Sequence, residues 1–316
     1  MANSVIFFGT SDFSKSVLAG LVDDPAFDVV AVVSQPDRPV GRKKVKLQTQ
    51  TKQLAVAHEL PVFQPEKLSG SPEMAELIAL QADFLVTAAF GQFIPTKLLK
   101  SAKIAAINVH ASLLPRYRGA APINWALING DKETGVSIMY MVKAMDAGDV
   151  IATDRLAIEA SDDAGSLFAK MAVLGCNLLL KTMPKLVTGE AKGQPQDNSL
   201  ATLAPKIDQQ LMRINFYRQS AEQVVNLVRG LSPHPGAFFQ LGDQRIKLLS
   251  AKVGDKIGQV GQLSIKNKGQ FGITAADGRV VLLERLQPAG KKVMTVAAFL
   301  NGQGRTFNVG SKTNEI

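Results

Sequence analysis

Short apolar runs alternate with helical patterns over the first 190 residues, and this alternation limits the folds available to the chain. Between several of the runs, apolar residues recur every three or four positions, as at residues 51–59 and 73–81. Such alternation is typical of a mostly parallel sheet with helices on both faces. We therefore predict an α/β, Rossmann-like first domain, with strands at residues 5–8, 28–33, 83–87, 104–109, 135–141 and 150–156.

The last third of the chain has a different pattern. Ser220 and Gln223 form a capping box ahead of an amphipathic helix. Short strand patterns separated by Gly and Asp turns then predict a small OB-like β-barrel. Between the two patterns, the stretch at 189–204 is rich in Gly, Pro, Gln, Asn and Ser, as linkers are. We predict a first domain at 1–188, a linker at 189–207 and a barrel domain at 208–316, with barrel strands at 237–241, 245–250, 259–265, 271–275 and 280–286.

The excess of positive over negative charge is confined to the predicted barrel domain. Residues 1–208 carry 21 Lys and Arg against 21 Asp and Glu, whereas residues 209–316 carry 15 against 6. A neutral domain joined to a basic one predicts that the second domain contacts a polyanion such as nucleic acid. The alternative is that the basic residues only keep a small domain soluble.

A second basic cluster lies in the first domain, at residues 38–52, and contains Arg42, Lys43, Lys44 and Lys46. It has no acid and few large apolar residues, which predicts a solvated loop. Because it follows the second strand, the loop would reach toward the ligand crevice at the carboxyl ends of the strands.

Composition excludes several classes of site. The one cysteine, Cys176, lies in a helical pattern and cannot form an internal disulfide. The three histidines are scattered, so we predict no metal site. The first turn, residues 9–13, lacks a Gly-x-Gly-x-x-Gly loop, which weighs against NAD. No apolar run reaches transmembrane length and the first strand begins at once, so we expect a soluble, cytoplasmic protein without a membrane partner.

Three polar residues form a candidate catalytic set. Asn108 and His110 are two apart in an apolar run, so on a strand both point the same way. Asp146 follows in a Gly-containing turn. Asn and Asp also favour turns, and a single His is often structural. The set nevertheless suits acyl transfer without a metal: an amide donates to an oxyanion, an imidazole moves protons and a carboxylate orients the imidazole.

The run from Asn108 to Ile123, Asn-Val-His-Ala-Ser-Leu-Leu-Pro-Arg-Tyr-Arg-Gly-Ala-Ala-Pro-Ile, closely resembles the signature of folate-dependent formyltransferases. The longest resemblance is to the members of this family that formylate methionyl-tRNA, and it covers nearly the whole chain. It includes residues 8–13, the basic stretch at 33–42, and residues 61–68, 89–95, 204–207, 235–238 and 286–292.

The resemblance implies the reaction and its partners. The formyl donor would be 10-formyltetrahydrofolate, and the acceptor would be the α-amine of methionine on initiator tRNA, with no DNA partner. Asn108 and His110 would stabilise the oxyanion, and Asp146 would fix His110. The folate would lie along Ser112, Leu113, Leu114 and Pro115 and the backbone near Phe90, Gly91, Gln92 and Ile94. The tRNA would contact Arg42, Lys43, Lys44, Lys46, Lys247, Lys266 and Lys268.

Three alternatives remain open on the sequence. A formyltransferase for a small amine would share Asn108, His110 and Asp146 but would not explain the basic barrel. An RNA-binding protein on an inactive scaffold predicts loss of one of the three groups, and all three are present. A formyl-folate hydrolase would use water in place of the amine.

Overall fold

The computed structural model describes residues 1–40 and 45–314, apart from the side chains of Val40, Lys256 and Ile257. The chain divides into two compact units. The first unit comprises residues 1–122, 134–156 and 168–205. The second comprises residues 123–133, 157–167 and 206–316. Both units therefore draw on the middle of the chain, which differs from the predicted consecutive domains.

The first unit is built on a seven-stranded, mostly parallel sheet, as predicted. Its strand order is β10-β9-β7-β6-β1-β2-β5, and the pairs along β5, β2, β1, β6 and β7 are parallel. Strand β9 pairs with β7 in the antiparallel direction. The strands are β1 (Asn3–Gly9), β2 (Phe27–Val33), β5 (Val62–Phe63), β6 (Phe84–Ala88), β7 (Ala105–His110), β9 (Glu133–Tyr140) and β10 (Val150–Ala157).

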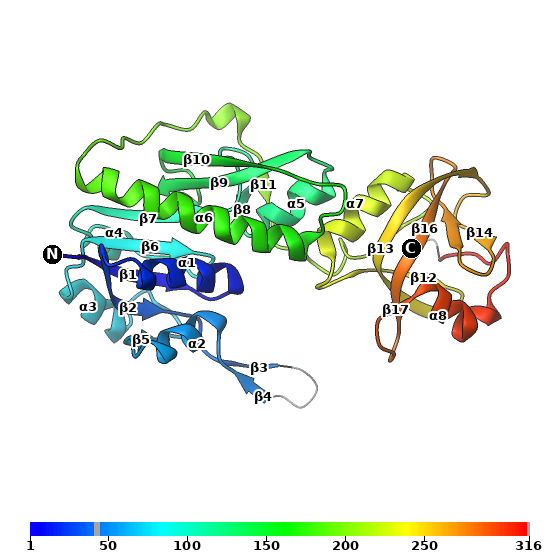
Figure 1. Cartoon of the computed structure of the whole chain (residues 1–316), viewed down its shortest axis with the longest axis horizontal. Coiled ribbons are helices and arrows are strands. Elements are labelled where there is room, and N and C mark those ends of the chain that lie inside the picture. Colours follow the sequence, from blue (N-terminus) through cyan, green and yellow to red (C-terminus); the bar gives the residue numbers. More distant parts are fainter. Residues whose placement is uncertain (41–44, 315–316) are drawn as a thin grey trace. The chain divides into compact units, whose positions relative to one another are not determined.

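Helices cover this sheet, and two of them lie together across one face (Figure 1). Helix α1 (Asp12–Asp23) begins at the N-cap Ser11, whose side chain accepts from the Ser14 amide. Helix α6 (Ala164–Val187) packs closely enough that a side chain at Gly175 would contact Phe13 of α1 and Val109 of β7. The remaining helices of this unit are α2 (Gln50–Ala57), α3 (Pro72–Ala79) and α4 (Thr96–Leu99).

By length and composition alone, α6 could cross a membrane, which differs from the expectation that no apolar run is long enough. Core helices pass the same test, and α6 buries Leu167, Met171, Leu179 and Met183. Cys176, also on α6, lies against Gly20 of α1. Its burial raises the pKa of the Cys176 thiol, which suits the predicted core role better than that of a nucleophile.

The basic stretch that was predicted to be a loop contains a two-stranded hairpin. Strands β3 (Arg38–Val40) and β4 (Val45–Leu47) pair in the antiparallel direction and project from the first unit (Figure 1). Each strand contains one β-branched residue, Val40 and Val45, but the local composition is otherwise not typical of strands. Arg42, Lys43 and Lys44 lie outside the described residues.

The segment predicted as a linker belongs to the first unit through residue 205. Gln194 pairs with Val150 of the edge strand β10, and β11 (Leu203–Ala204) pairs with β8 (Arg118–Gly119). A short 3-10 helix, η1 (Asn198–Leu200), lies between these two attachments. The stretch predicted to be a linker therefore bonds to the first unit through its backbone at these two points.

The second unit contains the predicted helix and an antiparallel sheet. Helix α7 (Ala221–Leu231) begins with the predicted capping box of Ser220 and Gln223. The sheet runs β12-β13-β16-β15-β14, and Thr313 and Lys312 bridge to Leu241 and Gln262 near its two edges. Its elements are β12 (Ala237–Leu241), β13 (Gln244–Ile257), β14 (Leu263–Lys266), β15 (Phe271–Thr274), β16 (Arg279–Pro288), β17 (Met294–Thr295), α8 (Val296–Asn301) and η2 (Gln303–Thr306).

The core of the second unit lies between α7 and this sheet and is rich in aromatic rings. Phe216 packs edge-on against Phe239, and Phe271 packs edge-on against Phe299. The earlier helix α5 (Pro122–Ile128) also contributes, because Ile128 packs against this core. Strand β13 was predicted to end at residue 250. It extends to residue 257, and the additional residues continue its pairing with β16.

Candidate active site

Strand β7 brings two of the predicted catalytic residues to its carboxyl end. Asn108 lies opposite Thr87 of β6 and Met139 of β9, and His110 lies opposite Ser137 of β9. The two side chains point the same way because they alternate on one strand. This is the edge of an open α/β sheet at which ligands bind.

Both ring nitrogens of His110 face protein oxygens. Its side chain is buried, and Nε2 lies 2.9 Å from the carbonyl oxygen of Tyr117. A carbonyl only accepts, so Nε2 carries a proton in this arrangement. Nδ1 lies 3.8 Å from Oδ2 of Asp146. That distance is too long for a hydrogen bond, but it is within ion-pair range once the imidazole is protonated.

Asp146 is held by backbone groups rather than by side-chain charges. Its own φ is +50°, a left-handed conformation that non-glycine residues adopt rarely. The amide of Gly119 donates to Oδ2 of Asp146 at 2.8 Å. The turn is closed at its base, where the Tyr140 amide donates to the Asp149 carbonyl at 2.9 Å. The turn therefore fixes the carboxylate beside His110.

The loop after β7 is also constrained. Tyr117 has a φ of +61°, and Gly119 has a φ of +124°. A side chain at Gly119 would meet the carbonyl oxygen of Ala204 at 2.7 Å. Unusual backbone conformations of this kind cluster at functional sites. Only a glycine fits where β8 approaches β11.

Asn108 differs from its two partners because its amide is free. The side chain is half-buried, and within the described part of the chain it has no hydrogen bond to protein. A partly desolvated amide with unused donors suits stabilisation of a developing oxyanion. The structure thus brings the three predicted catalytic residues together, and their catalytic roles stay a prediction.

The residues predicted to contact folate fall into two groups. Leu113, Leu114 and Pro115 are half-buried beside the catalytic strand. Ser112 is fully buried, and its hydroxyl donates to the Arg116 carbonyl at 2.6 Å, so it shapes the loop. Their contact with folate stays a prediction.

The second group surrounds the end of β6. The side chains of Phe90 and Ile94 are buried in the sheet core, which leaves only their backbone for a ligand. Gly91 is exposed with a φ of +84°. The Gln92 side chain accepts from the Leu68 amide at 2.8 Å and donates to the Pro65 carbonyl at 3.1 Å. Gln92 therefore anchors this loop, and its role toward folate stays a prediction.

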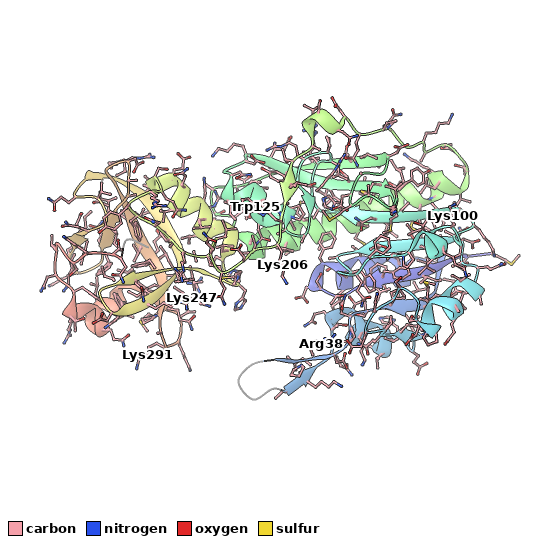
Figure 2. All side chains as sticks on the ribbon, turned by 180° about the vertical axis from the view of Figure 1, so that it is seen from behind. Arg38, Lys100, Trp125, Lys206, Lys247 and Lys291 are labelled. Carbon is pink, nitrogen blue, oxygen red and sulfur yellow. The ribbon has the colours of Figure 1, made fainter. Side chains whose placement is uncertain are left out.

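The basic residues predicted to contact tRNA are dispersed. Lys46 is exposed on β4, and Lys268 is exposed in the turn before β15. Lys247 donates to the Pro235 carbonyl at 2.9 Å, and Lys266 donates to the carbonyls of Phe307 and Arg305. Lys247 and Lys266 thus also support their own unit. Figure 2 shows further basic side chains on this unit, including Lys206 and Lys291.

One residue that contacts the Asp146 turn has no sequence signature. Gln196 lies in the stretch predicted to be a linker, and its side chain bonds to the backbone at Asp146 and Gly148. No local pattern identifies it, since the contact joins residues fifty positions apart. Among the described residues, no group of three His, Cys, Asp or Glu side chains is placed to hold a metal ion.

Family models match both parts of the chain. The formyl transferase model matches residues 2–183, and the model of the formyl transferase C-terminal domain matches residues 206–304. The fold, the paired Asn and His at the end of β7 and these matches define the class of protein: the chain belongs to the formyl transferase family.

Over nearly its full length the chain is similar to curated methionyl-tRNA formyltransferases. The chain is 51% identical over 311 residues to the methionyl-tRNA formyltransferase of Streptococcus equi subsp. zooepidemicus, covering 98% of this chain and 99% of that protein. It is 50% identical over 310 residues to the methionyl-tRNA formyltransferase of Lactobacillus acidophilus, covering 98% of each.

Solved structures share the fold at low identity. An N-formyltransferase from Helicobacter canadensis, solved with folinic acid and dTDP-3-aminofucose, aligns with a TM-score of 0.68 at 16% identity over 90% of this chain and 99% of that one. HypX from Aquifex aeolicus, solved with tetrahydrofolic acid, aligns with a TM-score of 0.62 at 17% identity over 99% of this chain. This chain spans 50% of HypX.

Proposed function

We propose that this protein transfers the formyl group of 10-formyltetrahydrofolate to the α-amine of methionyl-initiator tRNA. The observation that carries the proposal is the identity of about half of all residues with methionyl-tRNA formyltransferases over nearly the full length of both chains. That similarity includes the basic C-terminal unit. If the acceptor were a small molecule, the positive charge of this unit would have no role.

The catalytic set supplies the groups that this reaction needs. The amine nitrogen attacks the formyl carbon, and the carbonyl oxygen becomes an oxyanion. Asn108 donates an N–H of its side-chain amide to that oxyanion. His110 relays the proton lost by the amine, and Asp146 stabilises the positive charge of the protonated imidazole. The oxyanion re-forms the carbonyl as the bond from carbon to the folate nitrogen breaks, and that nitrogen takes up the proton that His110 received from the amine.

The basic residues of the two units would contact different parts of the tRNA. The hairpin of β3 and β4 would bring Arg42, Lys43, Lys44 and Lys46 to the acceptor stem. The second unit would hold the tRNA through phosphates, with Lys247, Lys266 and Lys268 among the contacts. Phosphate contacts position a nucleic acid without reading its sequence. A cytoplasmic location follows from the site of translation.

The test is formyl transfer from 10-formyltetrahydrofolate to charged initiator tRNA. Uncharged tRNA, which lacks the reacting amine, is the negative control, and free methionine and a sugar nucleotide with a free amine serve as alternative acceptors. We expect Asn108→Ala, His110→Ala and Asp146→Ala each to lower kcat by roughly 10²–10³, the cost of losing one oxyanion donor or its equivalent. His58→Ala is the matched control, because His58 is exposed at the end of α2.

The outcomes separate this function from its alternatives. Transfer to the sugar amine in preference to tRNA would identify a small-molecule formyltransferase. Release of formate without an acceptor would identify a hydrolase. Tight binding of tRNA with no turnover would identify a binding protein, and any of these results would overturn the proposal.

A further inference from the structure

One side chain outside the catalytic set bonds to both segments that hold the Asp146 carboxylate. The Gln196 side-chain nitrogen donates to the carbonyl of Asp146 at 2.9 Å and to the carbonyl of Gly148 at 2.7 Å. Its side-chain oxygen accepts from Nε and from one terminal nitrogen of Arg118, at 3.1 Å and 2.7 Å. A single amide therefore joins the Asp146 turn to strand β8.

These two segments are the ones that meet at Asp146 Oδ2. Arg118 precedes Gly119, whose amide donates to that oxygen at 2.8 Å. The same oxygen is the one that faces Nδ1 of His110. Gln196 thus sets the spacing between the turn that carries the carboxylate and the strand that holds it.

The chain around Gln196 is itself anchored on both sides. Gln194 forms a two-way backbone pair with Val150, at 2.9 Å and 2.8 Å. Further along, the Thr202 hydroxyl accepts from the Tyr117 amide at 2.9 Å, and the Thr202 carbonyl accepts from the Arg118 amide at 2.9 Å. From residue 194 to 200 only Gln196 is not exposed. Its side chain is therefore held at a fixed point rather than carried on a loose strand.

A glutamine is the residue type that this position requires. The two carbonyls of the turn need donors, and the guanidinium of Arg118 needs an acceptor. A primary amide offers both at the end of a side chain of this length. Glutamate would keep the acceptor and lose the donors, and methionine of similar length would lose both.

We propose that Gln196 is a positioning residue for formyl transfer, acting through Asp146 to keep the carboxylate beside His110. This inference rests on the proposed function for its kinetic test. Misplacement of a catalytic group by about 1 Å can lower a rate by as much as roughly 100-fold. Gln196 should therefore affect kcat and leave the KM values for folate and tRNA within about twofold.

The first experiment compares Gln196→Met and Gln196→Glu with Ser199→Ala in the full-length protein. Ser199 lies in the same segment and, among the residues that the structure describes, its side chain bonds only to Asp197, so it is a matched control. We expect kcat to fall by roughly 10- to 100-fold for both Gln196 variants and to stay unchanged for the control. Full activity of Gln196→Glu would show that the contact with Arg118 alone matters, and would overturn the proposal.

A double-variant cycle tests whether Gln196 acts through Asp146. If it does, adding Gln196→Met to Asp146→Ala produces no further loss, because the group being positioned is already gone. A loss that multiplies with that of Asp146→Ala would indicate an independent structural role and would refute the inference.

Hydrogen exchange provides a readout that does not depend on activity. We expect the peptide containing Gly119 to exchange faster in Gln196→Met, with the peptides of β1 and α6 unchanged. If the unchanged protein fails to formylate tRNA, the proposed function fails, and this measurement still tests the positioning role. If the protein is active and both the rate and the exchange match in Gln196→Met, the positioning role fails alone.

Discussion

At the scale of single residues, the site depends on backbone conformations that side-chain chemistry alone does not reveal. Asn108 and His110 were placed correctly, since a strand period of two puts them on one face. The left-handed conformations of Tyr117 and Asp146 could not be predicted, because neither residue type requires them. Both residues bond to side chains far along the chain, Tyr117 to Thr202 and Asp146 to Gln196.

Replacing Gly119 tests whether the site depends on the backbone conformation of this loop. Gly119→Ala would force a methyl group against the Ala204 carbonyl and shift the amide that donates to Asp146. We expect kcat to fall by roughly 10-fold or more, as for other displaced catalytic groups, together with a lower Tm. Gly70→Ala is the control, because Gly70 also has a positive φ, +81°, but has no atom within 4 Å of the added carbon.

The comparison of these two glycine variants separates strain from contact. Both variants place an alanine at a positive φ, which residues with a Cβ rarely adopt. If Gly119→Ala loses no more activity than Gly70→Ala, the approach of β8 to β11 does not position the carboxylate.

At the scale of elements, the hairpin of β3 and β4 is anchored at its base by a polar cluster. Lys52 of α2 donates to Oδ2 of Asp37 at 2.7 Å, and Gln64 donates to Oδ1 at 2.8 Å. Burial acts to raise the pKa of Asp37, but these hydrogen bonds and the Lys52 charge outweigh it and hold the pKa below its ordinary value of 3.8.

This lowered pKa determines how the anchor responds to pH. A carboxyl whose pKa is depressed in the folded state contributes stability above its unfolded pKa and loses it as pH falls through the folded value. We expect Asp37→Asn to lower Tm at pH 7 by about 2–4 °C for each kcal/mol of stability removed. The difference from the unchanged protein should begin to narrow near pH 3.8 and close further below.

Asp28→Asn is the control for that measurement, because Asp28 is an exposed residue of β2. Thermal unfolding followed between about pH 7 and pH 3 gives both curves. A difference in Tm that stays constant over this range would mean that the charge of Asp37 does not stabilise the hairpin base.

At the scale of the whole molecule, the fold class was predictable and the partition of the chain was not. Alternating apolar runs indicated the parallel sheet, and the capping box located α7, because both signals are local. The polar composition of the stretch at 189–205 favoured a linker. Its attachment through Gln194, Gln196 and Thr202 is made across the fold and has no local signature.

The charge asymmetry leads to a prediction for binding. Lys268, Lys291 and Lys292 are exposed in the second unit, unlike Lys247 and Lys266, which bond to carbonyls. Replacing the three with alanine should weaken binding of any tRNA. The slope of log affinity against log salt should also decrease by roughly 0.7–0.9 for each phosphate that is no longer neutralised.

The matched control replaces Lys97, Lys100 and Lys103, which are exposed in the charge-balanced part of the chain. Binding of initiator and elongator tRNA is measured at several salt concentrations. If both triple variants weaken tRNA binding equally, the net charge of the protein determines affinity and the second unit has no special role. If neither variant changes affinity or slope, the excess positive charge of the second unit serves only solubility.

The interleaving of the two units has a consequence for synthesis on the ribosome. Helix α5, translated early, contributes Ile128 to the core of the second unit, and the Asn124 side chain donates to the Gly230 carbonyl at 2.7 Å. Those partners leave the exit tunnel only after a further hundred residues or so. Until then Ile128 has no core to pack against, so its side chain stays exposed on the nascent chain while residues of the parallel sheet have already been translated.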